Sequence, residues 1–405
     1  MKIIYHGSHL FVPSFEIENR LRCLQDLMAQ EGLDGVLLCQ NVDLFYFSGT
    51  LQPGYLYIPA EEEPLLMVRK NLERALEESS LARIKELSHL KEIPSHLVDE
   101  GISPPQTLGL EMDVLPANTF LQFKNLFKKT KVSDASTLIR KCRMFKSPWE
   151  IENMKKAAEM VRKMTAAVPR LIGPGMTEIE LAGVLESFLR KEGHQGLIRT
   201  RGFNQEVYYG HVLSGPEGAR ASYLDAPSGG LGISPAFSQG SGLKLLRPHE
   251  PISIDYCGCF NGYIADQTRM FSIGPPVQAV AEAFAAIRRI LRSMELKAQP
   301  GVACDQLYWW AVEEAEQLGY GRTFMGSGSK RASYIGHGLG LDLDELPIIG
   351  QKFDWPLEAG MVLALEPKIM LPEHGLVGLE NTYQLTPEGL SALTTSPENF
   401  QVLSS

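Results

Sequence analysis

The sequence predicts two domains of mixed α and β structure, and three observations lead to this fold class. The chain has 405 residues, which is enough for more than one hydrophobic core. Helical and strand-like apolar patterns alternate through its first part. A helix-start signal at residues 146–150 is followed by a region in which a turn-and-helix pattern occurs twice. We therefore expect domains at residues 1–144 and 145–405.

The first domain is expected to have α/β structure. Leu21, Leu24 and Met28 follow helical spacing, and this helix should end near Gly32. Further apolar segments predict strands at residues 35–39, 55–58, 64–68 and 108–110, and a helix carrying three phenylalanines at residues 120–127. The sequence of this region contains no glycine-rich phosphate loop and no catalytic motif. A structural or substrate-capping role is the expected one.

Two capping boxes predict the first helices of the second domain. The segment Ser-Pro-Trp-Glu at residues 147–150 should begin a long helix that continues to about Ile172. Residues 173–175, Gly-Pro-Gly, interrupt the chain, and Thr177 with Glu180 should begin a second helix that ends at Gly193. Landmarks of this second helix recur 126 residues later: Pro174-Gly175, Leu181 and Gly193 correspond to Pro300-Gly301, Leu307 and Gly319. The second domain should therefore consist of two related halves about a pseudo-twofold axis.

Composition excludes several classes of protein. A net charge of −9 and the lack of a basic stripe argue against nucleic-acid binding. The sequence has no apolar run near the roughly 18 residues that a membrane span needs, and its start lacks the apolar core of a signal peptide. Six dispersed cysteines do not form a disulfide framework, so we expect a cytoplasmic protein. Cys257-x-Cys259 lacks the second cysteine pair that a thiolate metal site requires.

The most informative stretch, residues 252–273, reads as a β-hairpin. Its centre, Asn261-Gly262, suits a type I′ turn, and apolar residues alternate on both sides. Regular pairing places Asp255 opposite Thr268, so that Asp255 and Asp266 become diagonal neighbours on one face, roughly 7–8 Å apart. Cations could bridge that distance. The alternative is an exposed hairpin whose two acids are solvated.

Three further segments add ligand-type residues. His337 lies among glycines in the segment Ile-Gly-His-Gly-Leu-Gly, while Glu366 and Glu380 each interrupt an apolar strand pattern. Together with Asp255 and Asp266 they make one histidine and four carboxylates, a hard and oxygen-rich ligand set that could hold two divalent ions. Such a pair, about 3.5–4 Å apart, lowers the pKa of a bound water and polarises a carbonyl.

These motifs resemble those of the pita-bread metallopeptidases, which include prolidase, aminopeptidase P and methionine aminopeptidase. The resemblance is carried by Asp255, Asp266-x-Thr-Arg269, Gly336-His337-Gly-x-Gly, Leu365-Glu366-Pro367 and Glu380-x-Thr382. Residues 20–49 are similar to the creatinase-like N-terminal domain of that family. This domain points to the prolidase and aminopeptidase P branch, because methionine aminopeptidases lack it.

The resemblance also implies roles for individual residues. Asp255 would bind one metal ion, Asp266 and Glu380 would bridge both ions, and His337 with Glu366 would complete the other. Glu366 would in addition accept a proton from the attacking water.

His211, in Tyr-Gly-His-Val-Leu-Ser-Gly, matches the family histidine that stabilises the oxyanion or the leaving group. A core or surface histidine is the alternative. Three positions depart from the Xaa-Pro pattern: Asp344 replaces a downstream histidine, Gly378 an arginine, and Ser333 a histidine of aminopeptidase P. Asp344 could repel a substrate carboxylate or bind a substrate amine.

We therefore expect a metal-dependent exopeptidase of the Xaa-Pro dipeptidase or aminopeptidase P type. Its expected catalytic residues are His211 and Glu366, and its expected substrate-binding residues are His211 and Asp344. Two divalent ions per chain are expected, Mn²⁺ first, with Co²⁺, Zn²⁺ or Fe²⁺ as alternatives. The resemblance also implies a homodimer. Two other functions stay open: a creatinase-like hydrolase acting on a non-peptide C–N bond, and a peptide-binding relative without turnover.

Overall fold

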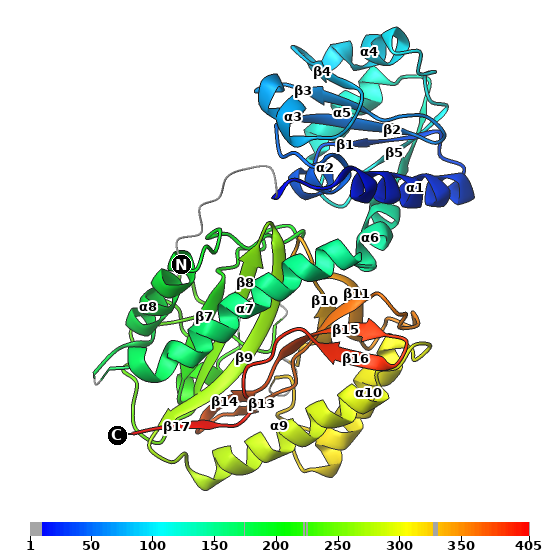
Figure 1. The fold of residues 1–405 in the computed structure, drawn as a ribbon. Helices are drawn as coiled ribbons and strands as arrows, with labels where there is room; N and C mark the ends of the chain where they lie inside the picture. Colours follow the sequence, from blue (N-terminus) through cyan, green and yellow to red (C-terminus); the bar gives the residue numbers. More distant parts are fainter. Residues whose placement is uncertain (1–9, 174, 222, 224–225, 327–330, 405) are drawn as a thin grey trace. The chain divides into compact units, whose positions relative to one another are not determined.

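The computed structural model describes residues 10–173, 175–221, 223, 226–326 and 331–404. The chain separates into two compact units, Met1–Arg143 and Met144–Ser405 (Figure 1). We keep residues 1–144 and 145–405 as the proposed domains. Pro174, one landmark of the predicted repeat, and the first nine residues of the chain lie outside the described residues.

The N-terminal unit is built on one mixed six-stranded sheet with the strand order β4-β3-β2-β1-β5-β6. Its strands are β1 (Gly35–Leu38), β2 (Gly54–Pro59), β3 (Leu65–Val68), β4 (Ile84–Glu86), β5 (Thr107–Leu110) and β6 (Lys131–Asp134). Its helices are α1 (Ser14–Glu31), α2 (Asn41–Ser48), α3 (Leu72–Glu78), η2 (Leu90–Glu92), α4 (Ile93–Asp99), α5 (Ala117–Leu126) and α6 (Ser136–Met144). The predicted α/β organisation is confirmed.

Local signals explain where these elements begin and end. Helix α1 buries the apolar positions that the sequence pattern identified, and it ends at Gly32, whose φ of 65° is left-handed. A buried ion pair ties two helical regions of the unit together, since Arg143 Nη1 lies 2.7 Å from Asp43 Oδ1. Burial makes this pair costly to break, because removing one partner leaves the other charge uncompensated.

Over the residues that the structure describes, the second unit contains three sheets and four long helices. The helices are α7 (Pro148–Leu171), α8 (Glu178–Lys191), α9 (Gln278–Lys297) and α10 (Cys304–Gln317), with a short 3₁₀ helix η3 (Pro216–Ala219). The first sheet has the order β17-β9-β8-β7, with β7 (Gly210–Ser214), β8 (Ile252–Phe260), β9 (Tyr263–Ile273) and β17 (Gln401–Leu403). The second has the order β11-β10-β12-β15-β16, with β10 (Tyr334–Gly338), β11 (Glu345–Gly350), β12 (Val362–Leu365), β15 (Asn381–Thr386) and β16 (Gly389–Ala392). Strands β13 (Lys368–Leu371) and β14 (Gly375–Gly378) pair separately.

Each half of this unit has two helices packed against a sheet. Helix α7 starts with the predicted capping box of Ser147 and Glu150, and it lies across β8 and β9 (Figure 1). Helices α9 and α10 contact each other and share a hydrophobic core with β10, β12 and β15. The apolar faces of α7 and α8 share a second core with β7, β8 and β9.

The predicted internal repeat has structural counterparts. The N-cap residues of α8 and α10, Thr177 and Ala303, each form an isolated antiparallel bridge to a distant segment. Leu181 and Leu307 are both fully buried. Both helices are followed by a glycine with a left-handed φ, 101° at Gly193 and 87° at Gly319.

The central hairpin forms with the predicted register. Asp255 pairs with Thr268, and the turn residues Asn261 and Gly262 have φ values of 50° and 85°, as a type I′ turn requires. All six cysteines are free thiols, and burial raises the pKa of Cys259 to about 12.

In the part of the chain that the structure describes, we find no helix that is both long and apolar enough to cross a membrane.

Helix α7 approaches β8 so closely that the contact requires a glycine. A Cβ atom on Gly258 would lie 1.9 Å from the carbonyl oxygen of Ala157. We predict that Gly258→Ala lowers the free energy of unfolding by on the order of 3 kcal/mol, because the helix must move away from the sheet. Chemical denaturation measures this loss. Gly183→Ala is the matched control, since space around the α8 glycine is open and alanine should stabilise the helix by about 0.5–1 kcal/mol. Equal stability of Gly258→Ala and the native chain would contradict this reading of the contact.

Stability should also depend on the protonation of His194, just beyond α8. This side chain is 2% exposed and stacks on Tyr209 at 4.6 Å between ring centroids. Burial, assisted by the charge of Arg190, lowers the pKa of His194 from 6.5 to about 4. The unfolded chain therefore takes up this proton at a higher pH than the folded one, so stability falls as the pH drops from 6.5 to 4.

The lost free energy of unfolding should be roughly 3 kcal/mol, measured by denaturation across that pH range. His194→Gln should remove most of this dependence. The control His374→Gln, in the turn between β13 and β14, should retain it. An unchanged pH profile in His194→Gln would rule out this histidine as the cause.

Candidate metal centre

The hairpin supplies two acidic side chains to the centre of the second unit. Asp255 lies on β8 and Asp266 on β9, and they are only 8% and 6% exposed. The alternative of a solvated hairpin is therefore wrong. Burying two carboxylates is costly unless positive charge or hydrogen bonds compensate them.

The second sheet supplies the other three predicted ligands. His337 lies on β10, Glu366 directly follows β12, and Glu380 directly precedes β15. Leu365 of β12 and Asn381 of β15 are register partners, so the two glutamates leave the sheet at the same end. All three side chains are buried.

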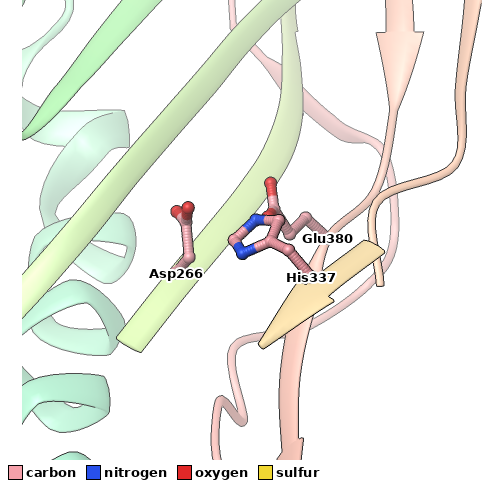
Figure 2. Close-up of side chains that lie close together, drawn as sticks. All are labelled: Asp266, His337 and Glu380. Carbon is pink, nitrogen blue, oxygen red and sulfur yellow. The ribbon is translucent and has the colours of Figure 1, made fainter. Parts of the chain in front are cut away.

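Three of the five predicted ligands form a compact donor group. Asp266, His337 and Glu380 each offer a ligand atom, and these atoms lie within 4.8 Å of one another. Figure 2 shows the three side chains reaching toward a common point from β9, from β10 and from the segment before β15. The Thr268 hydroxyl donates to Glu380 Oε2 at 2.8 Å and holds that carboxylate. One histidine and two carboxylates suit a divalent ion.

Electrostatics favour a cation at this point. Burial and then the charge of Asp255 raise the pKa of Asp266 to about 7. Burial, followed by the charge of Asp266, raises the pKa of Glu380 well above its ordinary value. Ionising either carboxyl group is therefore unfavourable without a nearby cation, and a divalent ion would relieve that cost.

A lysine that the sequence analysis missed lies among the predicted ligands. Lys368 Nζ is 2.7 Å from Glu366 Oε2, 3.1 Å from Asp255 Oδ2 and 3.4 Å from Glu380 Oε2. Its side chain is only 2% exposed. Burial alone lowers the pKa of a lysine, but these carboxylates outweigh it and hold the pKa of Lys368 well above its ordinary value. The group is therefore a fixed ammonium ion.

The position of Lys368 also explains one departure from the family pattern. Lys368 and Gly378 are register partners on β13 and β14. A Cβ atom on Gly378 would lie 2.6 Å from Lys368 Cγ, so the lysine stem fills the space of a side chain at position 378. The sequence offers one signal for this lysine, namely its position directly after the Glu-Pro pair. The signal indicates a residue of the site only once β13 is known to pair with β14, which places the lysine opposite Gly378. The sequence left that pairing open.

His211 lies on β7 beside the same carboxylates. Its register partner on β8 is Asp255, and His211 Nε2 is 3.7 Å from Asp255 Oδ2. Burial lowers the pKa of His211 more than the charge of Asp255 raises it, so the imidazole is neutral near pH 7. A neutral imidazole can donate one hydrogen bond and accept another.

Asp344 lies beside His337, the predicted histidine ligand, and is exposed to solvent. Asp344 Oδ1 is 3.6 Å from His337 Nδ1, the ring nitrogen that also lies 3.1 Å from the Gly338 carbonyl oxygen. Carboxylates and carbonyls in this position orient the ring of a metal-binding histidine. The side chain of Asp344 is 46% exposed, so it can also meet a substrate group.

One cavity joins these residues. Its lining includes all seven predicted site residues together with Lys368: His211, Asp255, Asp266, His337, Asp344, Glu366 and Glu380. Aromatic side chains, among them Tyr208, Phe237 and Tyr334, form other parts of the wall. The structure thus brings together every residue that the sequence analysis proposed for the site.

Arg269 supports the site from behind the hairpin. Its guanidinium group donates to the carbonyl oxygens of Thr268, Glu380, Ser396 and Pro397 and to Asn381 Oδ1, over 2.6–3.0 Å. The side chain is 1% exposed. It fixes the backbone at Glu380 to strand β9.

Fold and site together define a two-domain metallopeptidase. The family model of metallopeptidase family M24 matches residues 152–387, and that of the creatinase/prolidase N-terminal domain matches residues 20–145. The chain belongs to metallopeptidase family M24. Family membership confirms the expected class, a metal-dependent exopeptidase with a pita-bread domain, and does not favour a non-peptidase hydrolase.

Relatives agree with this assignment over most of the chain. A Xaa-Pro dipeptidase of Pyrococcus furiosus is 27% identical over 384 residues, covering 93% of this chain and 98% of the relative. The structure of the Pyrococcus horikoshii prolidase is 25% identical with a TM-score of 0.79, covering 94% of this chain and 99% of the other. The Thermotoga maritima X-Pro aminopeptidase is 26% identical with a TM-score of 0.76, covering 92% and 98%.

The supporting role of Arg269 gives a prediction about stability. Arg269→Lys should shift the denaturation midpoint to clearly lower denaturant, with a loss of the order of 3 kcal/mol, because lysine leaves several buried carbonyls without a donor. Arg292→Lys, an exposed position paired with Glu295, is the matched control and should leave the midpoint unchanged. If both variants unfold at the same denaturant concentration, the buried hydrogen bonds of Arg269 do not support the site.

Proposed function

We propose that this chain removes N-terminal residues from short peptides, with Xaa-Pro peptides as the first substrates to test. The observation that carries the proposal is the convergence of Asp266, His337 and Glu380 inside one cavity that also contains His211. The Xaa-Pro dipeptidase and aminopeptidase relatives support the substrate class.

The donor group of Asp266, His337 and Glu380 would hold the divalent ion, and this ion would act as the Lewis acid that activates water and polarises a carbonyl. Glu366 is the proposed proton acceptor. Its Oε1 lies 3.8 Å from His337 Nε2, and its Oε2 accepts a hydrogen bond from Lys368. This places one oxygen of the carboxylate toward the donor group.

His211 is the proposed donor to the oxygen or nitrogen of the scissile bond. Its ring lies beside Asp255 and lines the same cavity as His337, and its imidazole is neutral near pH 7. Donors placed where charge develops in the transition state are worth about 10²–10³ in kcat.

Asp344 is the proposed partner of the free α-amine of the peptide. It is partly exposed, it lines the cavity, and its charge is opposite to that of the amine. The arginine expected at position 378 is absent from the sequence, so a carboxylate anchor must come from another group. This combination favours recognition of the N-terminus of a peptide over recognition of its C-terminus.

The identity and number of the ions are part of the proposal. Carboxylate oxygens predominate among the ligands, which keeps Mn²⁺ as the first choice, with Co²⁺, Zn²⁺ and Fe²⁺ as alternatives. The sequence pattern predicted two ions. The ammonium of Lys368 contacts three of the five predicted ligands and so affects how many ions can bind.

We further propose a cytoplasmic homodimer. Six free thiols, several of them buried, suit a reducing compartment. The dimer follows from the resemblance of the N-terminal domain, and light scattering of the purified full-length chain would measure it.

The function is tested by metal removal and return. Protein stripped with a chelator should not cleave peptides, and added Mn²⁺ should restore the cleavage of some members of a panel of Xaa-Pro and non-proline dipeptides and tripeptides. Activity that survives the chelator would contradict the proposal. Metal-replete protein that binds peptides and never cleaves them would instead identify a binding protein.

His211→Gln tests the role of the imidazole in the same assay. We expect kcat to fall about 10²-fold, with ion binding unchanged, because the variant loses a positioned donor and no ligand. His374→Gln is the control and should keep full activity. A variant at His211 that keeps native kcat would remove this residue from the proposed mechanism.

A further inference from the structure

The side chain of Lys368 lies where the sequence pattern predicts the second metal ion. Its nitrogen contacts Asp255, Glu366 and Glu380, with no more than 3.4 Å to any of these three carboxylates. The two remaining predicted ligands, Asp266 and His337, form the donor group with Glu380. Asp255 and Glu366 therefore face the ammonium, Asp266 and His337 face the position that can hold an ion, and Glu380 is shared between the two.

An ion and this ammonium would compete for the same oxygens. Carboxylate ligands lie roughly 2.0–2.2 Å from a transition metal, so an ion on Asp255 and Glu366 would lie against the lysine nitrogen. Two cations in contact in a buried site repel each other strongly, because the surrounding dielectric is low. The lysine cannot swing out of the way easily, since its stem is buried over Gly378 and its backbone is held on β13.

We infer that Lys368 permanently replaces one of the two metal ions, so that this chain binds a single divalent ion through Asp266, His337 and Glu380. The inference rests on the proposed site but not on its catalytic activity. It also links Lys368 to one departure from the family pattern, because Gly378 leaves the space that the lysine stem occupies. The charge of the missing ion is partly supplied by the protein itself.

Ion counting tests the inference directly. Chelator-stripped, full-length protein is dialysed against Mn²⁺, and bound manganese is measured by mass spectrometry alongside calorimetric titration. The native chain should bind one ion and Lys368→Gly two, because the glycine variant frees the second position. Two ions in the native chain, or one in Lys368→Gly, would overturn the inference.

A matched pair of ligand variants keeps the test independent of how Lys368→Gly folds. Asp266→Asn should abolish binding of the single ion, whereas Asp255→Asn should leave the native count of one, since Asp255 contacts the ammonium. In a two-ion site both variants would lose an ion. Equal losses in the two variants would therefore overturn the inference.

A second lysine provides the control for burial. Lys146 is also almost fully buried and is 3.0 Å from Glu345, outside the donor group. Lys146→Met should keep the native ion count, and a changed count would show that loss of any buried lysine perturbs the site. Peptide cleavage is recorded separately, so a chain with one ion and no activity contradicts the proposed function and leaves the inference standing.

Discussion

Compensation of buried negative charge is the constraint on which the catalytic unit depends. Asp255, Asp266, Glu366 and Glu380 are all buried, the aspartates within strands and the glutamates directly beside the ends of strands. Such a cluster is stable only if cations or donors reach it. The Lys368 ammonium and the Thr268 hydroxyl meet part of that need, and the donor group around His337 leaves a place for a metal ion.

The two related halves of the unit explain how the cluster is assembled. The first half supplies aspartates from a hairpin, and the second supplies a histidine and two glutamates from adjacent strands. Each half buries the outer face of its sheet under two helices, so the strands are held rigidly against their own core. The carboxylates come together from β8 and β9 of the first sheet and from the strand ends of the second, and all four line one cavity.

Much of this was predictable because local signals were strong. The Asn261-Gly262 turn set the register of the hairpin, and period-two alternation then placed Asp255 and Asp266 on one face. Capping boxes located the start of α7 and α8. The contact of Lys368 with the carboxylates was not predicted. It depends on the pairing of β13 with β14, and no turn signal in the sequence specified the register of these two strands.

The sequence by itself determined the class of protein, the hairpin and the set of ligand-type residues, since these depend on residue identity and short-range spacing. Only the tertiary structure decided how positive charge is distributed among the carboxylates. Lys368 and Asp255 are far apart along the chain, and their 3.1 Å contact depends on how the two halves pack. A charge pair of this kind is set by distance in space, which the order of residues does not encode.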